Sequence, residues 1–149
     1  FMISMNKGES LKPLVQVASG GELSRLMLGL KVIFSQLQGI ETVVFDEIDT
    51  GVSGKVATMI GLKMRSLARS TQVFTVTHLA QVAACSEYHY FVSKDQSGEF
   101  TNTIVTELST SQRIEQLALI ATGTTTETAL ESARELLFSC QNLVRQIQK

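Results

Sequence analysis

The sequence predicts an α/β fold that contains a pair of parallel strands joined through a helix. Thr42–Phe45 and Gln72–Val76 are short apolar segments with the length and composition typical of buried strands. A helical pattern of apolar residues lies between them, and a longer one precedes them at Gly20–Gln38. Because strand–helix–strand connections join parallel strands by a right-handed crossover, both strands are expected to end at the same edge of one sheet. In such folds, ligands bind at this edge.

The first part of the chain is expected to form two extended segments and one helix. Residues 1–17 contain a turn signal at Asn6-Lys7-Gly8. The helix over Gly20–Gln38 is expected to end near Gly39. The strand that follows, Thr42–Phe45, is continuously apolar, which is typical of a strand covered on both faces.

The middle of the chain continues the alternation and then changes character. A loop at residues 49–54 leads into a helix whose inward stripe is expected to hold Val56, Met59, Ile60, Met64 and Leu67. The strand Gln72–Val76 comes next, and a short helix is expected within His78–Ala84. Beyond it, Tyr88–Ser93 and Phe100–Leu108 flank a turn sequence and predict a β-hairpin.

The last part of the chain is expected to be helical. A short helix around Arg113–Ala121 ends at Gly123, and a long amphipathic helix follows. Its apolar stripe contains Ala129, Leu130, Ala133, Leu136, Leu137, Cys140, Val144 and Ile147. Such a stripe most often docks against a sheet; pairing with another chain is the alternative.

Composition is typical of a globular protein. The 149 residues are 44% hydrophobic and 18% charged, so residues 1–149 are expected to form a single domain. No apolar run approaches the roughly 20 residues of a membrane span, and no secretory signal opens the sequence. A net charge of −1 gives no support for a nucleic-acid surface. Cys85 and Cys140 have no metal-ligand spacing and are expected to be buried free thiols. The start, Phe1–Ser4, suggests an excised fragment.

Polar residues stand where a phosphate could be received. Ser19, Gly20 and Gly21 precede the first long apolar helix, and helix starts offer free N–H groups and a favourable dipole to anions. The alternative is structural, because Ser19 and Glu22 also have the spacing of a capping box.

Two strand ends carry groups suited to hydrolysis. Asp46 and Glu47 follow the first apolar strand, and His78 follows the second. Asp46 and His78 are about 30 positions apart, the length of one strand–helix–strand unit. The acidic pair could be an ordinary polar strand end, and a lone histidine is more often structural. The order and spacing of the helix start, acidic pair and histidine favour nucleotide hydrolysis.

A phosphate-binding loop is missing from this sequence. Nucleotide hydrolases of this type use Gly-x-x-x-x-Gly-Lys-Ser/Thr to wrap the phosphates and hold magnesium. In the nearest candidate, Gly51–Val56, Asp49 stands where the first glycine is needed, and Val56 stands where a hydroxyl is needed. The loop is therefore expected to come from residues outside this sequence.

Four blocks carry a resemblance to a known family. The chain resembles the C-terminal ATPase-head half of the RecN family, bacterial DNA-repair proteins in the SMC-like branch of ABC-type ATPases. The blocks are Val17–Arg25, Phe45–Gly54, Val76–Ala83 and Thr128–Leu137. The first block is typical of the ABC superfamily. The sequence Gly-Val-Ser-Gly that follows the acidic pair narrows the resemblance to the RecN family. The implied fold is a P-loop NTPase-like ABC/SMC head, C-terminal half, with a largely parallel sheet flanked by helices, an extra β-hairpin and C-terminal helices.

The resemblance implies a signature motif that acts across a dimer. Ser19 and the amides of Gly20 and Gly21 would contact the γ-phosphate of ATP held by the opposite protomer. Glu22 completes the motif and stands where many transporters carry glutamine; SMC-like relatives tolerate glutamate there.

The resemblance also implies roles for the strand ends. Asp46 would place Mg²⁺ through water, Glu47 would orient or deprotonate the attacking water, and His78 would contact the γ-phosphate. A D-loop along the dimer seam would contain Thr50, Gly51, Val52 and Ser53.

At the level of the whole protein, the resemblance implies ATP-driven dimerisation of two heads in double-strand-break repair. DNA and a second copy of the head would be the partners, without a membrane, in the bacterial cytoplasm at the nucleoid. ATP and Mg²⁺ would bind only with the N-terminal half, so this chain alone is expected to be inactive. The alternatives are a non-catalytic interaction module on an ABC-like fold, or the head of another SMC-like ATPase.

Overall fold

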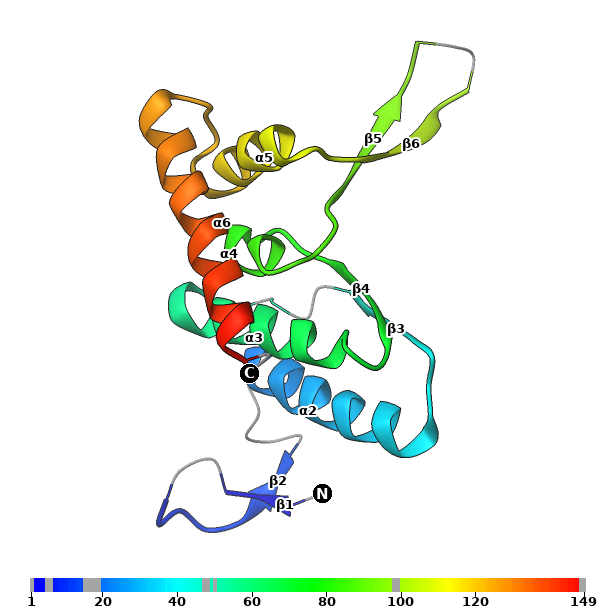
Figure 1. Cartoon of the computed structure of the whole chain (residues 1–149). Helices are drawn as coiled ribbons and strands as arrows, with labels where there is room; N and C mark the ends of the chain where they lie inside the picture. The colour runs from blue at the N-terminus through cyan, green and yellow to red at the C-terminus, as the bar shows by residue number, and fades with distance from the viewer. Residues whose placement is uncertain are drawn as a thin grey trace.

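The structure is a computed structural model that describes residues 2–4, 7–14, 20–46, 49, 51–97 and 100–147. Helices and strands alternate through most of these residues (Figure 1). In chain order they are β1 (Met2–Ile3), β2 (Lys12–Pro13), α2 (Gly20–Gln38), β3 (Thr42–Asp46), α3 (Gly54–Leu67), β4 (Gln72–Val76), α4 (Ala80–Ala84), β5 (Tyr90–Asp95), β6 (Asn102–Glu107), α5 (Thr110–Thr122) and α6 (Glu127–Ile147).

The predicted parallel pair is present. Strands β3 and β4 run parallel and are joined through α3, and their register pairs Thr42 with Gln72 and Asp46 with Val76. The other described strands form two separate antiparallel pairs, β1 with β2 and β5 with β6. The β5–β6 ribbon is the predicted hairpin and extends away from the helices (Figure 1). Parallel pairing within the described residues is thus confined to β3 and β4.

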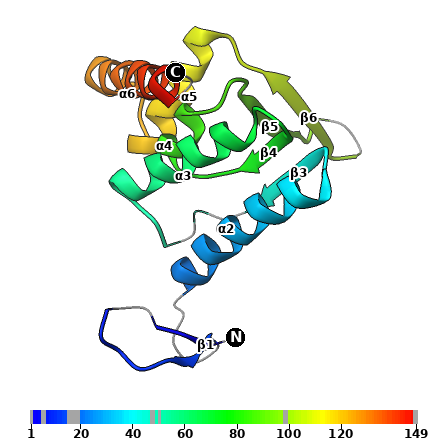
Figure 2. The same ribbon diagram turned by 60° about the horizontal axis from the view of Figure 1, so that its bottom comes forward.

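Helix α2 has the predicted bounds and ends where glycine permits a left-handed turn. Gly39 has a φ of 63°, and the N–H of Ile40 donates to the carbonyl of Ser35 at 3.1 Å. The chain then turns back from the end of α2 into β3 (Figures 1 and 2). Leu28 and Val32 of α2 are buried with Phe45 of β3 in one core cluster.

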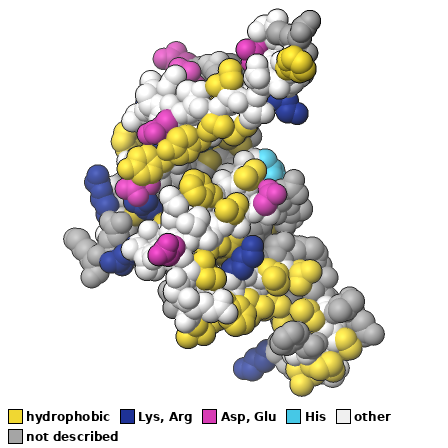
Figure 3. All heavy atoms as spheres, turned by 90° about the vertical axis from the view of Figure 1, so that its right-hand side faces the viewer, with side chains coloured by type: hydrophobic (Ala, Val, Ile, Leu, Met, Phe, Trp, Pro, Cys, Tyr) yellow, Lys and Arg dark blue, Asp and Glu magenta, His cyan; other side chains and the backbone are white. Residues whose placement is uncertain are grey.

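One face of the parallel pair is open. Val43 and Val73 lie on the face that packs against the core cluster, whereas Val44 and Phe74 point the other way and are 57% and 48% exposed. Successive side chains of a strand point to opposite faces, and the described helices cover only one of them. The prediction that Thr42–Phe45 is covered on both faces is therefore wrong for this chain. Hydrophobic side chains form several patches on the face shown in Figure 3.

Helix α3 buries a stripe next to the predicted one. Ile60, Met64 and Leu67 are buried as expected, but Val56 and Met59 are 44% and 68% exposed. The small residues Ala57 and Gly61 take their place on the buried face. A Cβ at Gly61 would lie 3.0 Å from Sγ of Cys85 and 3.3 Å from Cα of Val82, so glycine allows α4 and the residue after it to approach closely.

The C-terminal helix packs on helices. Its buried residues are Ala129, Ala133, Leu137 and Cys140, and they form a second core cluster with residues of α4, α5 and the turn after α4. The expectation of docking against a sheet is therefore wrong. The reason is that the two-stranded parallel pair is narrow and its core face is already occupied by α2 and α3, so the stripe of α6 is buried against α3, α4 and α5.

The two cysteines are buried free thiols, as predicted, and they lie side by side. Their mutual hydrogen bond, together with burial, raises the pKa of the Cys85 thiol, which keeps it protonated at neutral pH. Cys85 follows α4 and Cys140 belongs to α6, so the contact joins the last helix to the segment that follows β4.

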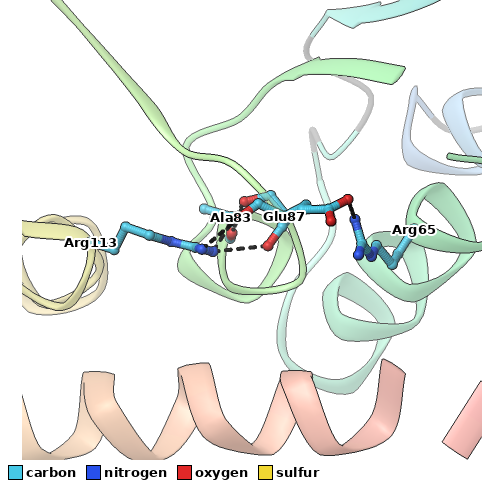
Figure 4. Close-up of polar contacts among 5 residues, drawn as sticks. Arg65, Ala83, Glu87 and Arg113 are labelled. Atoms are coloured by element: carbon cyan, nitrogen blue, oxygen red, sulfur yellow. Dashed lines mark hydrogen bonds and ion pairs between the residues drawn. The ribbon is translucent and has the colours of Figure 1, made fainter. Parts of the chain in front are cut away.

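Arg113 attaches α5 to the segment after α4 (Figure 4). Its guanidinium donates to the carbonyl oxygens of Ser86 and Glu87 at 2.9 and 3.0 Å. The carboxylate of Glu87 pairs with Arg65 of α3, and this hydrogen bond lowers the pKa of Glu87. The loop after α4 is therefore held from two sides, by α5 and by α3.

Replacing Leu137 with alanine is expected to lower the free energy of unfolding by about 3 kcal/mol, because Leu137 is fully buried and its removal leaves a cavity among α3–α6. Phe138 is the matched control: it is 52% exposed, so Phe138→Ala should change stability by less than about 1 kcal/mol. Chemical unfolding followed by circular dichroism measures both. Equal losses for the two variants would contradict this packing.

Candidate functional site

The C-terminal ends of β3 and β4 form one edge with polar side chains. Asp46 ends β3 and is exposed, and it stands in register with Val76, the last residue of β4. Thr77 and His78 follow Val76 directly, and the side chain of His78 is 65% exposed. The sequence prediction that Asp46 and His78 share one edge is thus confirmed by the parallel register.

A buried carboxylate lies behind this edge. Asp49 has no exposed surface, and its Oδ2 accepts a hydrogen bond from the hydroxyl of Thr77. The Thr77 oxygen in turn accepts the backbone N–H of Leu79 at 3.0 Å. The backbone carbonyl of Asp49 accepts the N–H of Val52 at 3.2 Å, which closes a turn. These bonds connect the loop after β3 with the loop after β4.

His78 lies against this carboxylate. Its Nδ1 is 3.8 Å from Oδ1 of Asp49, longer than a hydrogen bond but within the range of an ion pair. Among the described residues, Oδ1 of Asp49 has no hydrogen-bond partner although it is fully buried. The imidazole therefore has a buried carboxyl group on one side and solvent on the other.

The loop into α3 has glycine-dependent geometry. Gly51 and Gly54 have φ values of 71° and 54°, in the region that favours glycine. Val52 is 9% exposed and joins the core cluster, whereas Ser53 is exposed and makes no side-chain cap on α3. Of the predicted D-loop, Gly51, Val52 and Ser53 thus lie between the polar edge and α3.

Several predicted site residues fall outside the described residues. Ser19, Glu47 and Thr50 are in this group. Gly20, Gly21 and Glu22 form the first turn of α2, but only their backbone is described. Neither the capping box nor the phosphate contact predicted for Ser19 is therefore tested by the structure.

Sequence reasoning missed Asp49 and Thr77 as site residues. The sequence pattern places Asp49 in the loop at residues 49–54, where it rules out a phosphate-binding loop, and places Thr77 only within the block Val76–Ala83. The available signal was positional, since both residues follow the ends of two strands expected to be neighbours. What the sequence could not show is that the Asp49 carboxylate is turned inward and meets the second strand end.

The site has few groups for a metal ion. Among the described residues, no cluster of three or more His, Cys, Asp or Glu side chains is placed to hold one. The exposed carboxylate of Asp46 is a hard oxygen ligand of the type that Mg²⁺ accepts, but it would supply a single point of attachment.

No helix in the described ranges is long and apolar enough to span a membrane.

Comparison with known proteins identifies relatives of this chain. No protein-family model matches it. Curated proteins named DNA repair protein RecN match over most of it: the proteins of Halalkalibacterium halodurans and Bacillus subtilis are 47% and 44% identical over 138 residues, 92% of this chain. The protein of Vibrio cholerae is 44% identical over 140 residues, 93% of this chain. The resemblance to RecN is confirmed.

The match covers only part of the RecN relatives. The chain spans 24% or 25% of the length of these three proteins.

The fold is also shared with a solved chain from a study of ATP-driven dimerization and DNA-stimulated activation of SMC ATPases. That chain superposes with a TM-score of 0.62 at 18% identity, covering 79% of this RecN-like chain and 70% of the other. The α/β fold predicted from the sequence is thus confirmed.

Proposed function

We propose that residues 1–149 form the C-terminal lobe of an ATPase head in a RecN-type DNA-repair protein. The observation that carries this proposal is the polar edge of β3 and β4, where Asp46 and His78 lie together in a chain that is 41–47% identical to several RecN proteins. The sequence order of a serine-glycine helix start, an acidic strand end and a histidine strand end agrees with this assignment.

Each residue of the edge has a proposed task. Asp46 would hold Mg²⁺ through water, and the metal would neutralise charge that develops on the phosphates. Glu47 would orient or deprotonate the attacking water, and His78 would donate a hydrogen bond to the γ-phosphate from its exposed side. Phosphoryl transfer depends mainly on positioning and charge stabilisation, which this set of side chains can supply.

The other half of the site would come from elsewhere. This sequence has no Gly-x-x-x-x-Gly-Lys-Ser/Thr loop, and the RecN relatives are about four times longer than the chain. The open face of the parallel pair, with exposed Val44 and Phe74, is a surface that an N-terminal lobe could cover. Ser19, Gly20, Gly21 and Glu22 would serve the nucleotide of a second head, with Thr50–Ser53 along the seam between the heads.

ATP would then join two heads, and hydrolysis would release them. The intact protein would be a homodimer that acts on DNA at double-strand breaks in the bacterial cytoplasm, at the nucleoid. These partners follow from the similarity to RecN. The net charge of −1 gives them no independent support.

Complementation tests the proposal. This chain alone is expected to hydrolyse no ATP above background, because the phosphates and the metal would lack most of their ligands. Adding the remaining part of the head, expressed separately with its phosphate-binding loop, is expected to restore turnover. The readout is phosphate release at saturating ATP.

Two results would overturn the proposal. Robust hydrolysis by the chain alone would contradict the proposal that this chain supplies only part of the ATP site. A stable complex of the two parts that still hydrolyses no ATP would favour the alternative, a non-catalytic interaction module. An Asp46→Asn version of the chain is the matched control, since it should bind the other part but fail to restore turnover.

A further inference from the structure

Asp49 is a buried acidic residue to which the proposed chemistry gives no task. Its side chain has no exposed surface and comes from the loop between β3 and α3. A buried carboxylate is costly unless hydrogen bonds or a positive charge compensate it. Its surroundings should therefore reveal what it does.

One of the two carboxyl oxygens of Asp49, Oδ2, is hydrogen-bonded within the structure. Oδ2 accepts the Thr77 hydroxyl, and Thr77 is itself fixed by the N–H of Leu79 at 3.0 Å. This arrangement holds Thr77, and with it the backbone that carries His78, at a fixed place beside the loop after β3.

The other carboxyl oxygen, Oδ1, faces His78. Oδ1 has no hydrogen-bond partner among the described residues, and Nδ1 of His78 lies 3.8 Å from it. A shift of about 1 Å would bring the two atoms to hydrogen-bond distance. The His78 side chain is 65% exposed, so the ring has room to make this shift.

We propose that Asp49 is a positioning residue that orients the His78 imidazole, with Nδ1–H directed to Asp49 and Nε2 left to face the nucleotide. This inference rests on the proposed function, because it assigns His78 to the γ-phosphate. The physical reason is that the two nitrogens of an imidazole diverge, so a partner on Nδ1 fixes where Nε2 points. In its doubly protonated form the ring donates from both nitrogens, to Asp49 and to the phosphate.

Coupled substitutions in the full-length protein test the inference. Asp49→Asn keeps the size of the side chain but removes its charge, and it is expected to lower kcat for ATP hydrolysis by about 10- to 100-fold with KM changed less than about 3-fold. In a protein that already carries His78→Ala, the same substitution should have no further effect on kcat, because the residue it acts through is gone.

Thr77→Val is the matched structural control. It removes the hydrogen bond to Oδ2 and leaves Oδ1 facing His78. Nitrogen NMR of histidine-labelled protein without nucleotide gives a readout independent of turnover, with the His78 signals identified by their loss in His78→Ala. Asp49→Asn should change the tautomer balance of His78 more than Thr77→Val, which keeps the Asp49 carboxylate.

Each outcome decides one question. Additive effects of Asp49→Asn and His78→Ala, or an unchanged His78 tautomer, would overturn the positioning role even if the wild-type protein is active and Glu47→Gln is not. A wild-type protein that hydrolyses no ATP would overturn the proposed function itself, and this inference with it. If Asp49→Asn does not fold, Asp49→Glu, which keeps the charge but displaces it, is used in the same cycle and must also show coupling to His78.

Discussion

Replacing Glu47 with glutamine in the full-length protein is expected to lower ATP turnover by about 100-fold or more and to leave an ATP-bound dimer. Glutamine has nearly the same shape but cannot take a proton from the attacking water. Binding of ATP and Mg²⁺ would be retained, because Asp46 and the signature residues are unchanged. Since hydrolysis is the step proposed to separate the heads, the dimer should accumulate. Single-turnover kinetics and light scattering after size-exclusion chromatography measure the two effects.

Glu41→Gln provides the matched control for this prediction. Glu41 lies immediately before β3, at the opposite end of the strand from Asp46, and its side chain is exposed. The bond that it makes to Gln72 uses its backbone carbonyl, which the substitution leaves in place. Glu41→Gln should therefore retain wild-type turnover. A Glu47→Gln protein that remains monomeric with ATP, or that turns over normally, would contradict the assigned role.

Replacing Ser19 with arginine is expected to abolish turnover in a homodimer, and mixing this variant with Glu47→Gln is expected to restore part of it. A large side chain at the start of α2 would block the partner's γ-phosphate from the helix N-terminus. In a mixed dimer, one site would combine the intact strand end of the Ser19→Arg protomer with the intact signature of the other. Random mixing of equal amounts should give about a quarter of the wild-type rate, since half the dimers are mixed and each has one complete site.

The mixing experiment separates action across a dimer from action within one protomer. If Ser19 served its own nucleotide, no pairing of the two variants would assemble a complete site. Mixed dimers that form, as shown by two different affinity tags, but recover no turnover would contradict the role in trans. Activity of Ser19→Arg alone would favour the other interpretation of this residue, as a helix cap.

Sequence patterns predicted the helices and strands well because local rules act on them. Gly39 ends α2 at the expected position, since only a residue that accepts a positive φ can turn the chain there. The bounds of β4 and the parallel pairing of β3 with β4 also agree with the prediction. These features depend on nearby residues and on the handedness of one connection.

Predictions of burial were weaker because burial depends on which elements meet. Met59 has the spacing of a core residue in α3, yet the close approach of α4 at Gly61 turns a neighbouring stripe inward. Val44 is as apolar as Val43, but no described element covers its face of the sheet. Apolar spacing alone does not say which partner is present.

The order of the elements, the parallel strand pair and the shared edge of Asp46 and His78 could all be predicted, because they follow from local periodicity and the crossover rule. Two features emerged only from the folded chain: Asp49 turns inward to Thr77 and faces His78, and α6 packs on helices. The physical reason is that the direction of a loop side chain and the partner of an apolar stripe are set by contacts between residues far apart in the chain. Such contacts leave no periodic signal in the sequence.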